Sequence, residues 1–149
     1  MELLRFADVA DFMTRATEFE TLVTVNADLL GEDPAAAGVL EKINCRIAIT
    51  PFDDATAKKA TIAMGVRHWS EVQGTMVNSL NMLQKLNACP VCPDENLWAA
   101  YQVVSYMAGS KFEAAADAFR QAGEYAPVLA GLTYDAIKST GKLLEGGEA

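Results

Sequence analysis

The first thirty residues place apolar side chains at spacings of three and four. These positions are Val9, Phe12, Met13, Ala16, Phe19, Leu22, Val23, Leu29 and Leu30, with charged residues between them. Such a repeat is typical of one face of an amphipathic helix. Thr17 followed by Glu20 has the pattern of a capping box, although β-branched residues at 21–25 weaken a helix. The pattern therefore predicts two helices with a bend near Thr17.

The next helix is predicted to begin at Pro34, in the stretch PAAAGVLEKI. Gly31 ends the preceding helix, and Asp33 supplies a cap. Residues 43–52 then alternate isoleucine with polar or small residues and end near Pro51, a pattern that fits either a short strand or an extended connection. Because the pattern offers no evident partner strand, we interpret this stretch as an extended connection.

The most regular repeat in the chain follows Val66. Before it, Asp53 or Asp54 can cap a helix over ATAKKATIAM, which Gly65 closes. From Val66 onward, apolar residues recur at threes and fours over about five turns of 3.6 residues each. They are Trp69, Val72, Met76, Leu80, Leu83 and Leu86. This repeat predicts a long amphipathic helix.

Three further helices are predicted in the C-terminal third. Asp94 can cap ENLWAAYQVVSYMA, which is apolar on nearly every side and is expected at the centre of the fold. Gly109 and Ser110 turn the chain into KFEAAADAFRQAGEYA, and Pro127 begins a last helix that runs to about Leu144. We therefore expect an all-α fold: one compact multi-helix domain over residues 1–144, with 145–149 as a frayed tail.

Composition narrows the classes of function. The chain has 149 residues, of which 51% are hydrophobic and 21% charged, as in an ordinary globular domain. Its net charge of -8 would repel a phosphate backbone, so nucleic acid is not expected as a partner. No apolar run reaches the roughly 18 residues needed to span a membrane. Three cysteines, an odd number, indicate reduced thiols, so we expect a soluble cytoplasmic protein.

Residues 98–127 resemble one tetratricopeptide repeat, in which two antiparallel helices pack through small and large residues at fixed places. Tyr106 and Phe112 match the aromatic positions late in the first helix and beside the turn. The small, large, small and terminating positions of the second helix are matched by Ala115, Phe119, Ala122 and Pro127. The resemblance implies a helical hairpin followed by a capping helix.

In that family the first helix of the hairpin lines a groove for a partner protein. The resemblance therefore implies that Tyr101, Val104 and Met107 contact a partner. Since the helix is apolar nearly all round, the same three residues could instead belong to the core. Both interpretations stay open from the sequence.

Cys89 and Cys92 form a C-x-x-C pair between prolines. Thiolates three apart can bind one zinc ion, and Cys45 with His68 would complete a Cys₃His set. A redox pair is a second possibility, although such pairs normally follow a strand. The third interpretation is a rigid turn, because Pro90 and Pro93 disfavour helix on either side.

No recognised catalytic or nucleotide-binding motif is present, so no catalytic residue is assigned and an enzyme is not the favoured class. The favoured function is a non-catalytic helical interaction module, such as an adaptor, an assembly factor or a small subunit, that binds another protein or a second copy of itself. The alternatives are a helical protein stabilised by zinc at the Cys₃His set and a thiol-dependent enzyme that uses the C-x-x-C pair. A cofactor other than zinc is not expected.

Overall fold

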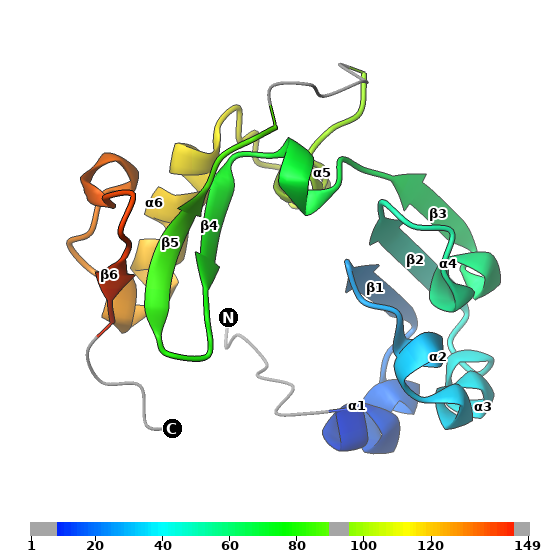
Figure 1. The fold of residues 1–149 in the computed structure, drawn as a ribbon. Helices are drawn as coiled ribbons and strands as arrows, with labels where there is room; N and C mark the ends of the chain where they lie inside the picture. Colours follow the sequence, from blue (N-terminus) through cyan, green and yellow to red (C-terminus); the bar gives the residue numbers. More distant parts are fainter. Residues whose placement is uncertain (1–8, 90–95, 145–149) are drawn as a thin grey trace. The chain divides into compact units, whose positions relative to one another are not determined.

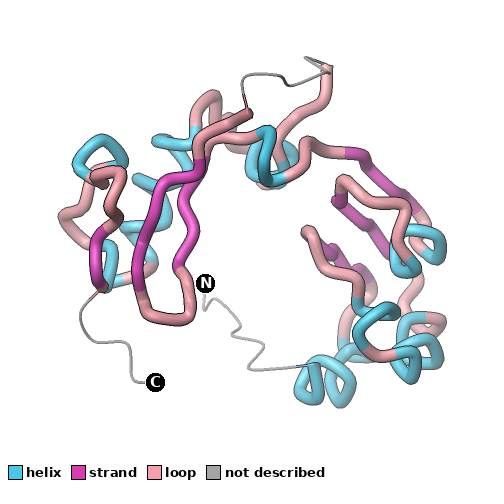
Figure 2. Tube along the Cα trace, viewed as in Figure 1, coloured by secondary structure: helices cyan, strands magenta, loops and turns pink. Residues whose placement is uncertain are grey.

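The computed structural model describes residues 9–89 and 96–144. The chain divides into two compact units, Met1–Val66 and Arg67–Ala149. Among the described residues each unit contains a three-stranded sheet with helices beside it (Figure 1), and strands and helices alternate along much of the chain (Figure 2). The fold is therefore mixed α and β, and the prediction of an all-α helical bundle is wrong.

The N-terminal unit alternates strands with short helices. Its strands are all parallel and pair in the order β1-β2-β3. A parallel pair needs a long crossover connection, and here each crossover contains helical segments. The elements are α1 (Val9–Arg15), η1 (Ala16–Glu18), β1 (Thr21–Val25), α2 (Leu29–Glu32), η2 (Pro34–Ala36), α3 (Ala37–Leu40), β2 (Cys45–Thr50), α4 (Ala55–Lys59) and β3 (Ile62–Gly65).

Three predictions for this unit are wrong. The helix expected over ATAKKATIAM and closed by Gly65 ends at Lys59, and its second half is strand β3. The second helix expected after Thr17 is instead strand β1, whose sequence TLVTV is rich in β-branched residues. The stretch interpreted as an extended connection is the central strand β2, paired with β1 and β3. The predicted caps are confirmed: Asp33 accepts a hydrogen bond from the amide of Ala35, and Asp54 accepts one from the amide of Ala57.

The core of the N-terminal unit lies between its helices and one face of the sheet. Phe12 and Ala16 pack with Leu40 and Ile43, and Leu22 of β1 lies against this cluster. Arg46 fixes the carboxyl ends of two helical segments, because its guanidinium donates to the carbonyls of Leu40, Ile43 and Lys59.

The C-terminal unit is built on an antiparallel sheet in the order β4-β5-β6. Helix α6 contacts β4 and the short helix η5, around a core of Leu83, Phe119, Ile137 and Leu144. The elements are η3 (Trp69–Glu71), β4 (Gly74–Val77), β5 (Met82–Leu86), α5 (Ala100–Met107), α6 (Ala115–Tyr125), η4 (Pro127–Leu129), η5 (Tyr134–Ala136) and β6 (Lys142–Leu143).

The long helix predicted from Val66 to Leu86 is wrong, because this segment forms the hairpin β4-β5. Its turn is held by the side chain of Asn78, which accepts hydrogen bonds from the amides of Leu80 and Met82. The last helix expected from Pro127 to Leu144 is also wrong, since η4, η5 and β6 occupy that stretch. Helices α5 and α6 confirm the two helices predicted over 95–108 and 111–126. The expectation that the first of them lies at the centre of the fold is wrong, because Ser105 is the only buried residue of α5. Asp94 and the tail 145–149 lie outside the described residues.

No helix in the part of the chain that the structure describes is both long and apolar enough to cross a membrane.

Candidate functional site

One face of the parallel sheet in the N-terminal unit is apolar and partly exposed. The register places Val23, Ile47 and Ile62 in one row across the three strands, and Val25, Ile49 and Met64 in the next. Val23 is 40% exposed, Val25 41% and Ile62 49%, whereas Ile49 at the centre is buried. We call this surface the open face and define it by Val23, Val25, Ile47, Ile62 and Met64.

The opposite face of the same sheet is covered by helices. Leu22, Thr24 and Ala48 point to this side, where a small cavity is lined by Leu40 of α3 and by Thr56 and Lys59 of α4. Thr24 and Ala48 are buried, and the hydroxyl of Thr24 donates to the carbonyl of Ile47. The helical layer and the open face therefore lie on opposite sides of the sheet.

An open apolar face is unusual for a parallel sheet. Parallel sheets occur almost only where both faces are covered, since their crossovers supply helices to the two sides. The antiparallel sheet of the C-terminal unit also exposes apolar residues on one face, including Met76 (50%) and Leu143 (58%). Antiparallel sheets commonly have one solvated face, so this second surface is ordinary. The open face is the surface that requires an explanation.

The outer strands of the parallel sheet lack two of the usual protections against pairing, charged residues and prolines. In the three-stranded sheet formed by the described residues, β1 and β3 are the edges. Neither strand contains a charged residue or a proline. Edge strands of soluble proteins are usually blunted by such residues. The edge strands and the open face therefore both indicate a surface suited to contact with another polypeptide.

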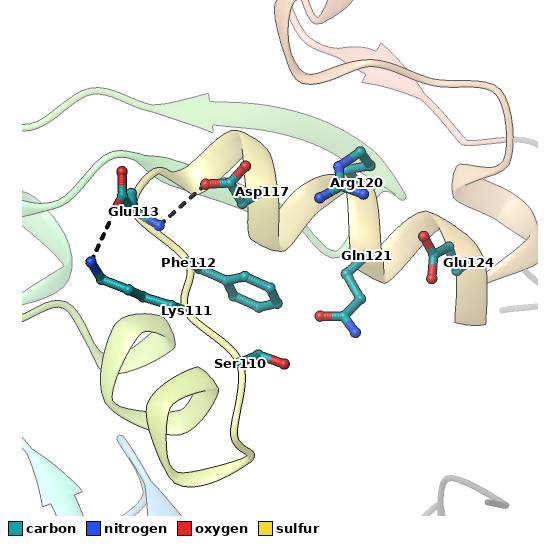
Figure 3. Close-up of a pocket in the computed structure, with 8 residues that line it drawn as sticks. All are labelled: Ser110, Lys111, Phe112, Glu113, Asp117, Arg120, Gln121 and Glu124. Carbon is teal, nitrogen blue, oxygen red and sulfur yellow. Dashed lines mark hydrogen bonds and ion pairs between the residues drawn. The ribbon is translucent and has the colours of Figure 1, made fainter.

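A second candidate site lies on the C-terminal unit, where the loop after α5 meets α6. A hollow of about 630 Å³ is lined by Ser110, Lys111, Phe112, Glu113, Asp117, Arg120, Gln121 and Glu124 (Figure 3). A smaller hollow of about 220 Å³ shares three of these lining residues, Lys111, Phe112 and Glu113. We call the two together the loop groove.

The inner end of the loop groove is aromatic. Trp98 and Tyr106 line the smaller hollow together with Phe112. The rings of Trp98 and Tyr106 meet edge to face, with centroids 5.8 Å apart and an angle of 81° between their planes. Trp98 is 48% exposed and Tyr106 66%. Two large aromatic side chains thus remain accessible beside a cavity.

The residues predicted to bind a partner all lie on α5. Val104 is 40% exposed and Met107 47%, so these two side chains are accessible in the C-terminal unit. Tyr101 is half-buried, and burial raises the pKa of its hydroxyl. The sequence reasoning missed Tyr106, which is more exposed than any of the three. Partner contact by Tyr101, Val104 and Met107 stays a prediction.

The proposed zinc ligands are in different parts of the chain. Cys45 belongs to the N-terminal unit and His68 and Cys89 to the C-terminal unit, while Cys92 lies outside the described residues. Nδ1 of His68 lies 2.8 Å from the hydroxyl of Ser70, in a capping arrangement at η3. Within residues 9–89 and 96–144 no cluster of metal-ligating side chains is found.

Comparisons with known proteins give no family for this chain: no family model matches it, and no curated protein matches its sequence.

The open face is not among the predictions made from the sequence, although the sequence contains a pattern that indicates it. The stretches TLVTV, RIAIT and TIAMG are short and rich in Val, Ile and Thr, and helix-capping aspartates stand between them. Strands that alternate with helical segments indicate βαβ units and a parallel sheet. Every second residue of such a strand points to the same face of the sheet. This pattern would have identified Val23, Val25 and Ile62.

Proposed function

We propose that this protein is a non-catalytic interaction module that binds a helical segment of another protein on its open face. The observation that supports the proposal is a parallel sheet with helices on one face and exposed Val23, Val25 and Ile62 on the other. Burying such side chains contributes about 25 cal/mol for each Å² of apolar surface removed from water. A partner that covers the face would gain this free energy.

A helix is the occupant that best fits a parallel sheet. The two faces of such sheets are covered by helices in known folds, because an apolar stripe on a helix complements the row of branched side chains on the strands. The open face presents branched or flexible apolar side chains on all three strands. An amphipathic helix laid across them would restore the usual three-layer arrangement.

Charge favours a different protein over a second copy as the occupant. Residues 1–66 contain eleven acidic and six basic residues, so this unit carries a net charge of -5. Two copies placed face to face would repel each other, whereas a helix with basic flanks would be attracted. We therefore expect a basic partner in the cytoplasm.

The test is a charge placed on the open face. The tagged chain is expressed in its own cells and purified under mild conditions as wild type and as Val25→Lys. A lysine there would leave an unpaired charge inside the interface, so we expect at least about a hundredfold weaker binding of the partner. Folding of the variant should survive, because lysine is well tolerated on an edge strand.

Leu80→Lys is the matched control. Leu80 is 75% exposed in the hairpin turn of the C-terminal unit, far from the open face in sequence and in a different unit. The same partner should be recovered with wild type and with Leu80→Lys and be lost with Val25→Lys. Equal recovery with all three proteins, or recovery of nothing but a second copy of the chain, would refute the proposal.

A further inference from the structure

The loop that lines the loop groove is held by hydrogen bonds within the chain. The loop that follows α5 folds back on the helix: the amide of Ser110 donates to the carbonyl of Ser105, and the amide of Phe112 donates to the hydroxyl of Ser105. At the other end the carboxylate of Asp117 accepts from the amides of Glu113 and Ala114. A site held in place in this way loses little entropy on binding.

The loop groove consists of two adjoining hollows, of which the larger, about 630 Å³, falls within the range typical of small-molecule pockets and the smaller does not. Its aromatic hollow, about 220 Å³, is smaller than the roughly 300–1,000 Å³ typical of small-molecule pockets. The larger hollow shares Lys111, Phe112 and Glu113 with it and extends along α6, where Figure 3 shows the ring of Phe112 between the loop and Gln121. We call the smaller hollow the aromatic end of the loop groove and the larger hollow its polar end.

The aromatic end is suited to proline. A polyproline II segment is already extended, has no internal hydrogen bonds, and docks its rings on grooves lined by exposed aromatic side chains. Trp98 and Tyr106, perpendicular to each other and 5.8 Å apart, provide two such surfaces, and Phe112 provides a third. Lining groups such as Gln121 can donate hydrogen bonds to the free carbonyls of the segment.

The polar end is weakly acidic. Its lining includes three carboxylates, Glu113, Asp117 and Glu124, against the two cations Lys111 and Arg120. Lys111 is already paired with Glu113 at 3.0 Å. Two carboxylates, Asp117 and Glu124, then remain against one cation, Arg120. In a chain of net charge -8, this excess of negative charge favours a ligand with a positive charge near its proline residues.

We infer that the loop groove binds an extended, proline-containing segment of a protein partner, with its prolines against Trp98 and Tyr106 and a basic residue toward Glu124. This site is independent of the open face and belongs to the other unit, so either can fail without the other.

The test uses Trp98 as the reporter. The chain has two tryptophans, so Trp69→Phe leaves Trp98 as the single tryptophan, which is excited selectively over the four tyrosines at the red edge of its absorption. The probe is a synthetic polyproline peptide with one arginine, and the two comparison peptides have alanine in place of every proline or glutamate in place of arginine. We expect a saturable change in Trp98 emission with the first peptide and at least about tenfold weaker binding with the alanine peptide. The glutamate peptide should bind more weakly than the arginine peptide.

Two tyrosine variants in the Trp69→Phe background separate groove binding from unspecific binding. Tyr106→Ala should weaken the binding of the polyproline peptide at least about tenfold. Tyr125→Ala is the matched control: Tyr125 is 59% exposed on α6 and lines neither hollow, so binding should not change. Both side chains are exposed, so the fold, checked by circular dichroism, should persist. No saturable change, equal binding of the alanine peptide, or full binding by Tyr106→Ala would overturn the inference.

Discussion

At the scale of single residues, Asp28 joins two crossovers of the N-terminal unit. One carboxylate oxygen accepts hydrogen bonds from the amide of Gly31 at 3.1 Å, the amide of Thr56 at 3.0 Å and the hydroxyl of Thr56 at 2.8 Å. The carboxylate therefore caps α2 and also contacts the first turn of α4. Burial opposes ionisation, but the hydrogen bonds from Thr56 and Gly31 outweigh it and lower the pKa of Asp28.

We expect Asp28→Asn to lower the free energy of unfolding of the N-terminal unit by about 1 kcal/mol near neutral pH, because hydrogen bonds to a charged acceptor are replaced by weaker ones. The pKa of Asp28 in the folded protein lies below its ordinary value of 3.8. The stabilisation is therefore complete above pH 3.8 and is lost as the pH falls through the lower folded pKa. Urea unfolding followed by circular dichroism should show the two proteins converging on acidification.

Asp53→Asn is the control for this prediction. The carboxylate of Asp53 is 85% exposed and pairs with Lys58 at 3.2 Å, an exposed ion pair of little energetic weight. A loss of stability by Asp53→Asn as large as that by Asp28→Asn would contradict the role given to Asp28.

Residues that act locally were predictable, and residues that act over long distances were not. Asp33 and Asp54 cap helices that begin immediately after them, so a short sequence window was enough. Asp28 contacts Thr56, which lies 28 positions later in the sequence. Such a contact depends on the topology of the sheet, which the sequence analysis had missed.

At the scale of elements, one glycine fixes the end of the C-terminal sheet. Gly141 immediately precedes β6 and has a φ of +80°, in the left-handed region that other residues rarely adopt. A Cβ at this position would lie 2.8 Å from the carbonyl oxygen of Leu83 on β5. The close approach of β6 to β5 therefore depends on glycine.

We expect Gly141→Ala to reduce the free energy of unfolding of the C-terminal unit by about 2 kcal/mol, from backbone strain and the close contact with β5. Tryptophan fluorescence during urea unfolding measures this unit, because Trp69 and Trp98 both belong to it. Gly123→Ala is the control, since Gly123 lies in helix α6 of the same unit and a Cβ there would lie at an ordinary distance of 3.6 Å from the carbonyl oxygen of Leu129. That change should leave stability equal or slightly higher; a loss equal to that of Gly141→Ala would contradict the explanation.

Element type was predicted correctly where one pattern stood alone. Helices α5 and α6 have no competing signal except at their ends. In residues 66–86 the apolar spacing of a helix coincides with that of two short strands, and Asn78 and Asn81 form the turn between these strands. In residues 21–25 the β-branched residues favour a strand, whereas the apolar spacing favours a helix; the structure has a strand.

At the scale of the whole molecule, each unit has its own sheet and its own buried core within the described residues. An interaction role was expected from the absence of catalytic motifs and from helical surfaces. The surface that supports it is instead the open face, which appears only when β1, β2 and β3 are placed in register. Periodicity within one segment could not reveal it, because the face is assembled from three segments.

The most direct measurement for this account is site-specific photo-cross-linking inside the native cell. A photoreactive residue replaces Val25 on the open face or, as the control, Gly38, which is exposed on α3. We predict that position 25 forms a cross-link to a helical segment of one other protein and that position 38 does not. Cross-links from position 25 that reach only this chain, or a second copy of it, would contradict the account.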